Sequence, residues 1–195
     1  MKRTSKIVRE TKETKISVSV DLDGTGKSDI QTKVGFFDHM LNALAHHSGI
    51  DMMIDAVGDL HVDDHHMVED IGLCLGQALK EALGDKRGIT RYGSAYIPMD
   101  EALARVVIDF SGRPYFVWSC ELSLNQVGTM QAESVPEFFR ALSTTAGMTL
   151  HMDLIRGDNL HHSLEAFFKA FAKALKLAVE IKGDSDEIPS TKGIL

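Results

Sequence analysis

Apolar and polar residues alternate in two separate stretches of the chain, "IDMMIDAVG" at 50–58 and "MTLHMDLIRG" at 148–157. An alternation with a period of two predicts strands that bury one face. Each stretch follows a segment in which apolar residues recur at helical spacing up to a glycine, Gly49 in one case and Gly147 in the other. A second helical pattern follows each stretch, so the order helix, strand, helix occurs twice.

Two further strand-like stretches precede the first helix of each set. At 14–36 and at 103–122, Val and Ile alternate with polar residues around the turn-forming sequences "DGTG" and "SGRP", and we expect both stretches to fold as hairpins. Each half then has the order strand, strand, helix, strand, helix. We predict an α+β fold, a two-layer α/β sandwich made of two duplicated half-domains with helices on one face of a mixed sheet. The repeats are expected at 1–88 and 89–183, followed by a C-terminal arm at 184–195.

The duplication carries a chemical motif, because "HHMVED" begins at His65 and "HHSLEA" begins at His161, each at the start of the second helix of a half. We expect Asp63 and Asp64 to cap the first of these helices. In each motif the first His and the Glu are four positions apart and share a helix face, whereas the second His points about 100° away. The six residues are His65, His66, Glu69, His161, His162 and Glu165.

Imidazole and carboxylate groups without a nearby cysteine suit Mn, Fe, Zn, Co or Ni. Two adjacent helical histidines cannot easily bind one ion, so the motifs predict two metals, or sites completed by neighbouring subunits. A single motif of this kind would more often be a helix-capping pattern with solvated histidines, but its recurrence at equivalent positions favours the metal interpretation. His39 in the first helix is a further candidate ligand, and Glu137 is its counterpart in the second half. Four other histidines fit a ligand, supporting or structural role equally well: His46, His47, His61 and His151.

Composition excludes several classes of protein. A chain of 195 residues with 44% hydrophobic content can bury a core. Its apolar runs are too short to cross a bilayer, and "MKRTSKIVRE" lacks the apolar centre of a signal peptide, so we expect a cytoplasmic protein. The net charge of -7 without a cluster of Lys and Arg argues against nucleic-acid binding. Cys74 and Cys120 are too few for a disulfide framework.

One motif points elsewhere. "ISVSVDLDGTG" has the form of the nucleophile loop of haloacid-dehalogenase-type phosphatases, and the later "GDSDE" imitates their acidic loop. That fold needs repeated strand–helix–strand crossovers, whereas the region between these two motifs is a duplicated unit with hairpins. We therefore interpret "DLDGTG" as a turn.

Several motifs together resemble the imidazoleglycerol-phosphate dehydratase family of histidine biosynthesis: "FFDHML", "GDLHVDDHHMVEDIG", "MDEALARVVIDFSGRPY", "MTLHM", "HHSLEAFFKAFAKAL" and "IPSTKG". The resemblance runs from about Arg9 to the end of the chain. It implies a fold like that of domain 2 of ribosomal protein S5. It also implies two Mn²⁺ ions per active site, and active sites at the subunit interfaces of a closed assembly of twenty-four copies.

The resemblance also assigns residues. The family's metal-ligand positions correspond to His39, His65, His66, Glu69, Glu137, His161, His162 and Glu165. Position 137 is a departure, since some relatives carry His there. Glu13 corresponds to the family's acid/base, and substrate- and phosphate-binding positions correspond to Arg91, Arg113, Lys169, Ser190, Lys192 and His47. Asp100 and Glu101 fit either support of a metal ligand or capping of a turn.

The implied reaction is the dehydration of imidazoleglycerol phosphate to imidazole acetol phosphate. No carbonyl acidifies the proton that leaves, so activation has to come from the ring, through a metal-bound imidazolate and a diazafulvene-like intermediate. Glu13 is expected to remove the proton from the neighbouring carbon. Arg113 can bind the phosphate bidentately, and Lys192 on the C-terminal arm can close over it.

Two other functions remain open. A metal-dependent hydrolase of a phosphorylated small molecule would use the same ions and would release free phosphate. A non-catalytic metal-binding module would need neither Glu13 nor the basic residues.

Overall fold

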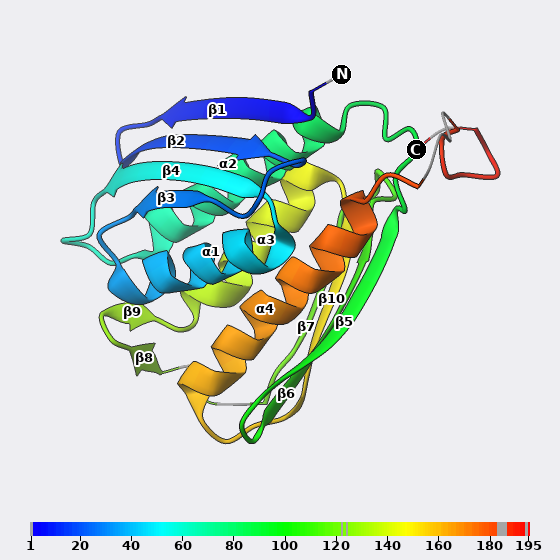
Figure 1. Ribbon diagram of the computed structural model, residues 1–195. Helices are drawn as coiled ribbons and strands as arrows, with labels where there is room; N and C mark the ends of the chain where they lie inside the picture. The colour runs from blue at the N-terminus through cyan, green and yellow to red at the C-terminus, as the bar shows by residue number, and fades with distance from the viewer. Residues whose placement is uncertain (1, 122, 124, 183–186, 194) are drawn as a thin grey trace.

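Two four-stranded sheets lie on either side of two packed layers of helices. The structure is a computed structural model, and it describes residues 2–121, 123, 125–182, 187–193 and 195. The helices α1 and α2 cover the first sheet, and α3 and α4 cover the second (Figure 1). The two helical layers pack against each other through the pairs α1–α4 and α2–α3. The predicted α+β fold of two half-domains is therefore confirmed, and each half is a sheet covered by helices.

The first half is a mixed sheet with the strand order β1-β2-β4-β3. The strand β2 pairs antiparallel with β1 and β4, and β3 pairs parallel with β4. Its elements are β1 (Thr4–Glu10), β2 (Thr14–Asp21), β3 (Ser28–Gln31), α1 (Gly35–Ser48), β4 (Asp51–Gly58) and α2 (His65–Leu83).

The second half repeats this sheet with the order β5-β6-β10-β7, in which β7 pairs parallel with β10. A separate sheet of two short strands, β8 and β9, precedes α3. The elements are β5 (Tyr92–Met99), β6 (Ala102–Asp109), β7 (Tyr115–Ser119), β8 (Gln126–Val127), β9 (Met130–Gln131), α3 (Ser134–Ala146), β10 (Thr149–Arg156) and α4 (Leu160–Val179).

The predicted hairpins at 14–36 and 103–122 are wrong. β2 and β3 do not pair with each other but lie on opposite sides of β4, and β6 and β7 flank β10 in the same way. The hairpins are β1–β2 and β5–β6 instead, so each half begins with a strand that the predicted order strand, strand, helix, strand, helix lacks. The Asp51 carboxylate accepts hydrogen bonds from the backbone of Thr25 and Lys27, at 2.7 and 2.8 Å, and fixes the β2–β3 connection to the start of β4. The interpretation of "DLDGTG" as a turn is thereby confirmed.

The helix ends follow local signals. Gly49 and Gly147 end α1 and α3 with φ of 77° and 67°, a left-handed conformation that glycine adopts without strain. Asp63 accepts a hydrogen bond from the His65 backbone N–H at 2.9 Å, as expected of a residue at a helix start. Asp64 occupies the N-cap position of α2, as predicted, but its side chain makes no cap hydrogen bond.

The buried carboxylate of Asp64 joins the two halves. It accepts hydrogen bonds from the Ser134 hydroxyl at 2.6 Å and the Gln131 backbone N–H at 2.7 Å, both in the second half. Aromatic packing joins them too, since the rings of Phe37 in α1 and Phe138 in α3 meet edge-to-face at 5.3 Å. Among the helices of the described residues, none is long and apolar enough to cross a membrane.

Candidate metal centre and basic cavity

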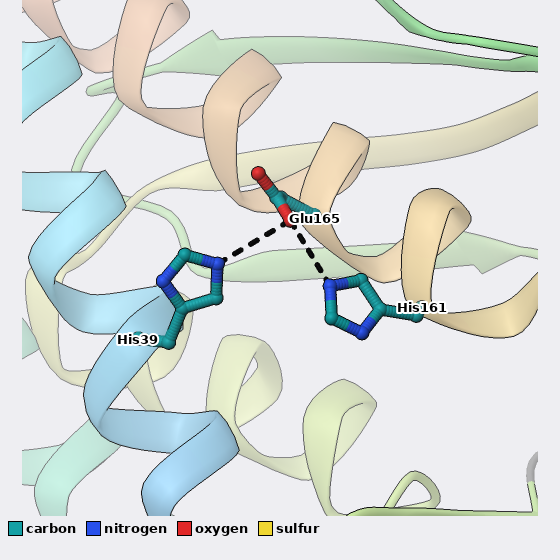
Figure 2. A group of neighbouring side chains, drawn as sticks. All are labelled: His39, His161 and Glu165. Carbon is teal, nitrogen blue, oxygen red and sulfur yellow. Dashed lines mark hydrogen bonds and ion pairs between the residues drawn. The ribbon is translucent and has the colours of Figure 1, made fainter.

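Three of the predicted ligands meet where α1 and α4 pack together. The Nε2 atoms of His39 and His161 lie 3.4 and 3.2 Å from the same carboxylate oxygen, Oε2 of Glu165 (Figure 2). All three ligand atoms are within 4.8 Å of one another. His39 comes from the first half and the other two residues from the second, so the helical layer assembles the cluster from both halves.

The carboxylate is buried whereas the histidines face solvent. The side chain of Glu165 is 8% exposed, compared with 55% for His39 and 44% for His161. Burial raises the pKa of Glu165, but the hydrogen bond and charge of Lys169 and the proximity of His39 outweigh it, so this pKa lies below its ordinary value. The Lys169 ammonium is 2.6 Å from the other oxygen, Oε1. A charged carboxylate is therefore kept between two imidazoles that open to solvent.

This donor set fits a divalent transition metal. Two imidazoles and one carboxylate are ligands for Mn, Fe or Zn, and three protein ligands leave coordination positions for a substrate. The exposed side of the cluster gives access to a small molecule.

The counterpart residues of the first half form no such cluster. His65 Nε2 and Glu69 Oε2 are 3.8 Å apart on α2. Glu137 in α3, the counterpart of His39, is paired with Arg140 at 3.1 Å. Within the described ranges, the cluster around Glu165 is the one group of three ligands this close together. The other predicted ligands do not join the Glu165 cluster within one chain: His65, His66, Glu69, Glu137 and His162.

The second histidine of each pair is held by a carboxylate through Nδ1. His66 Nδ1 lies 3.1 Å from Asp59, and His162 Nδ1 lies 2.8 Å from Glu101. The hydrogen bond to Asp59 raises the pKa of His66 against the effect of burial, and the charge of nearby Glu13 adds to the increase. The hydrogen bond from His162, followed by that from the Asn159 backbone, lowers the pKa of Glu101 to about 2.

The undecided histidines lie outside the cluster. His47 lies near α4, where burial and then the charges of Lys173, His46 and Lys169 lower its pKa. Its ring contacts that of His46 edge-to-face at 5.1 Å. His61 and His151 are exposed at the surface.

A basic cavity of about 630 Å³ lies between the end of α2, the start of β5 and the C-terminal arm. Four of the predicted phosphate-binding residues line it: Arg91, Arg113, Ser190 and Lys192. Lys169 does not line it, because it is bound to Glu165. Arg91 is fixed by Asp109 at 2.7 Å and by the carbonyl oxygen of Pro189 in the arm at 2.9 Å.

Sequence reasoning missed two lysines of this cavity, Lys80 and Lys86. Lys86 is only 8% exposed, and burial followed by the charges of Lys80 and Arg91 lowers its pKa. A buried ammonium beside two other cations is unfavourable unless an anion joins them. Nothing in "GDKRG" distinguishes Lys86 from an ordinary surface lysine, so only the fold could identify it.

The basic cavity and the histidine motifs lie at opposite ends of the helices. Lys80 follows His65 by fifteen positions on α2, which is about 22 Å at the helical rise. Arg91 is hydrogen-bonded to the carbonyl oxygen of Ala178 near the end of α4, whereas His161 lies at its start. The two groups of residues are therefore well separated within one chain.

The chain is similar to known proteins of one family. Residues 32–175 match the family model described as imidazoleglycerol-phosphate dehydratase. The chain is 59% identical over 194 residues to the imidazoleglycerol-phosphate dehydratase of Roseobacter denitrificans, covering 99% of this chain and 100% of that protein. It is 58% identical over 196 residues to that of Ruegeria pomeroyi, with the same coverage.

Solved structures give the same result. The imidazoleglycerol-phosphate dehydratase of Staphylococcus aureus has a TM-score of 0.83 at 47% identity, over 92% of this chain and 99% of that one. The Pyrococcus furiosus protein, solved in complex with (S)-C348, has a TM-score of 0.84 at 38% identity, over 97% of this chain and 100% of that one. The chain therefore belongs to the imidazoleglycerol-phosphate dehydratase family.

Proposed function

We propose that this protein is a hydro-lyase of histidine biosynthesis that dehydrates imidazoleglycerol phosphate to imidazole acetol phosphate. The observation that carries the proposal is the cluster of His39, His161 and Glu165, which is built to hold a metal at an open surface. The basic cavity supports it, because a phosphorylated substrate needs a cationic site as well as an activating one. Membership of the family supports the choice of substrate.

The metal is proposed to be Mn²⁺, with two ions per active site. His39, His161 and Glu165 would hold one ion, and ligands from the set His65, His66, Glu69, Glu137 and His162 would complete the sites. Bound metal ions supply Lewis acidity, which favours loss of a proton from the imidazole ring of the substrate. The intermediates expected from the sequence stay predictions.

Proton transfer is assigned to Glu13. It lies in the turn between β1 and β2, its side chain is exposed, and it is close enough to His66 for its charge to affect that residue's pKa. We propose that this carboxylate, close to the helix that begins with His65, takes a proton from the carbon next to the ring. The turn is tied to α2, because Thr14 and Arg9 hydrogen-bond to Asp70 at 2.5 and 2.9 Å.

Phosphate binding is assigned to the basic cavity. The guanidinium group of Arg113 can bind a phosphate bidentately, and Ser190 and Lys192 add donors from the arm. Arg91, held by Asp109 and Pro189, adds positive charge at the cavity wall. His47 and Lys169 lie near Glu165, away from this cavity, so we expect them to act near the metal.

A complete active site is proposed to need more than one copy of the chain. An imidazole with a three-carbon phosphate arm is much shorter than the separation of about 22 Å between the motif at the start of α2 and Lys80 near its end. One substrate molecule cannot reach both within one chain, so neighbouring subunits must contribute. This agrees with the proposed assembly of twenty-four copies. We also propose that the chain has repeats at 1–88 and 89–183 and a C-terminal arm at 184–195, and that it acts in the cytoplasm. Residues 184–186 and 194 of the arm lie outside the described residues.

The test is formation of the keto product from imidazoleglycerol phosphate by metal-stripped protein and by the same protein refilled with Mn²⁺. Turnover that disappears on stripping and returns with Mn²⁺ supports the proposal. Release of free phosphate instead would identify a hydrolase. Metal binding without any turnover would leave a non-catalytic metal-binding protein.

A further inference from the structure

The two halves present equivalent carboxylates to their histidine pairs. Glu13 is the last residue before β2 and Glu101 is the last residue before β6, each in the turn of the first hairpin of its half. Asp59 directly follows Gly58, the last residue of β4. Asp158 is the second residue after the end of β10 and also follows a glycine. Each histidine pair is therefore accompanied by one turn glutamate and one aspartate at the end of the neighbouring strand.

The halves use these carboxylates differently. In the first half the aspartate holds the second histidine, because Asp59 contacts His66 Nδ1 at 3.1 Å. In the second half the turn glutamate does so, because Glu101 contacts His162 Nδ1 at 2.8 Å. The other member of each set does not contact its histidine: Glu13 is exposed without a hydrogen bond to its carboxylate among the described residues, and Asp158 is exposed.

Glu101 is fixed on both of its oxygens. While Oε2 binds His162, Oε1 accepts hydrogen bonds from the backbone of Asn159 at 2.9 Å and of Asp158 at 3.4 Å. Asn159 is the N-cap of α4, and its side chain accepts from the His162 backbone N–H. Glu101 thus ties the β5–β6 turn to the start of the helix that carries the ligands.

We infer that Glu101 is a positioning residue for His162, as Asp59 is for His66, while Glu13, the counterpart of Glu101, is left without this task. A carboxylate on Nδ1 fixes the tautomer and the ring orientation, so that Nε2 is presented to the metal. The duplicated half-sites have therefore divided the work between equivalent residues. The role of Glu13 in this inference rests on the proposed function, whereas the roles of Glu101 and Asp59 concern metal binding alone.

The experiment measures Mn²⁺ binding by calorimetry to the metal-stripped full chain. Glu101→Gln and Asp59→Asn should each weaken Mn²⁺ binding about 10- to 100-fold, the usual effect of losing a carboxylate behind a ligating histidine. The matched variant is Asp158→Asn, the positional counterpart of Asp59, and it should bind Mn²⁺ with the affinity of the parent protein. Parent affinity in Glu101→Gln, or an equal loss in Asp158→Asn, would overturn the inference.

A double-mutant cycle separates positioning from general damage to the fold. If Glu101 acts through His162, Glu101→Gln should weaken Mn²⁺ binding no further in a His162→Gln background. A full additional loss in that background would show that Glu101 acts through the fold and would overturn the positioning role. Turnover of the unmodified holoenzyme is measured in parallel. If the variants bind Mn²⁺ with the expected affinities but the holoenzyme shows no turnover, the proposed reaction is wrong and the positioning of the histidines still holds.

Discussion

His39 and Glu165 lie 126 positions apart in the chain, yet His39 Nε2 and Glu165 Oε2 are 3.4 Å apart in the structure. The contact exists because α1 of the first half packs against α4 of the second. The candidate metal ligands of the duplicated chain therefore meet at the interface between its halves.

Removing His39 tests this cluster. His39→Gln takes one of three ligands from a site that Glu165 and His161 cannot complete alone, so we expect Mn²⁺ affinity at one site to fall by at least about tenfold. Calorimetric titration of the stripped protein measures the change. His46→Gln on the same helix is the matched control, and similar losses in both variants would contradict the assignment.

Lys86 provides a test of the basic cavity. Lys86→Met keeps the length of the side chain and removes the buried charge, so binding of inorganic phosphate should weaken about tenfold, as expected for loss of one charged hydrogen bond. The anion-free protein should be no less stable, because the variant no longer buries an ammonium beside Lys80 and Arg91, a cost that Asp109 offsets only in part. Phosphate titration and thermal unfolding measure the two effects, with exposed Lys176→Met as the control.

The sign of the pH dependence follows from the lowered pKa of Lys86. Between its folded pKa and its ordinary value of 10.5, the unfolded chain binds more protons than the folded one, so this residue makes stability rise as pH rises through that window. Lys86→Met should remove that contribution. An identical alkaline stability profile in both proteins would argue against a strained buried charge.

Asp64 should stabilise the contact between the two halves. Asp64→Ala leaves the buried Ser134 hydroxyl and the Gln131 backbone N–H without their acceptor, which should cost about 2–3 kcal/mol of unfolding free energy. Asp63→Ala removes only a hydrogen bond at the helix start and should cost about 1 kcal/mol. Urea unfolding of the metal-free protein measures the unfolding free energy of both variants. Equal losses would show that Asp64 contributes no more than a helix-start residue.

The sequence predicted what local signals determine. Gly49 and Gly147 ended their helices as expected, and the histidine pairs opened theirs, because capping and periodicity act over a few residues. Strand pairing was not predictable in this way. The β2–β3 connection is held to the start of β4 by Asp51, which accepts hydrogen bonds from Thr25 and Lys27 across 24 to 26 positions, a contact that an alternation pattern does not reveal.

The candidate site shows the same limit. Matching the two halves identified His39 and Glu137 as counterparts, but only the fold shows that His39 joins a cluster while Glu137 pairs with Arg140. Likewise, Lys86 and Glu101 acquire their importance from neighbours distant in sequence. A surface lysine and a buried one look alike in a sequence, because burial is a property of the packed chain.

Metal removal should affect assembly as well as activity. If ions are shared between subunits, they bind the assembled state more tightly than separate chains, so chelation shifts the equilibrium towards smaller species and lowers the unfolding temperature. At an ion concentration of 100 times the dissociation constant, the stabilisation at one site is about 2.7 kcal/mol.

Analytical ultracentrifugation before and after chelation, and again after Mn²⁺ is restored, measures the effect. His39→Gln should already sediment partly as the smaller species in the presence of Mn²⁺. A sedimentation profile that does not change on chelation would show that each chain holds its ions alone, and the separation between the histidine motifs and the basic cavity would then need another explanation.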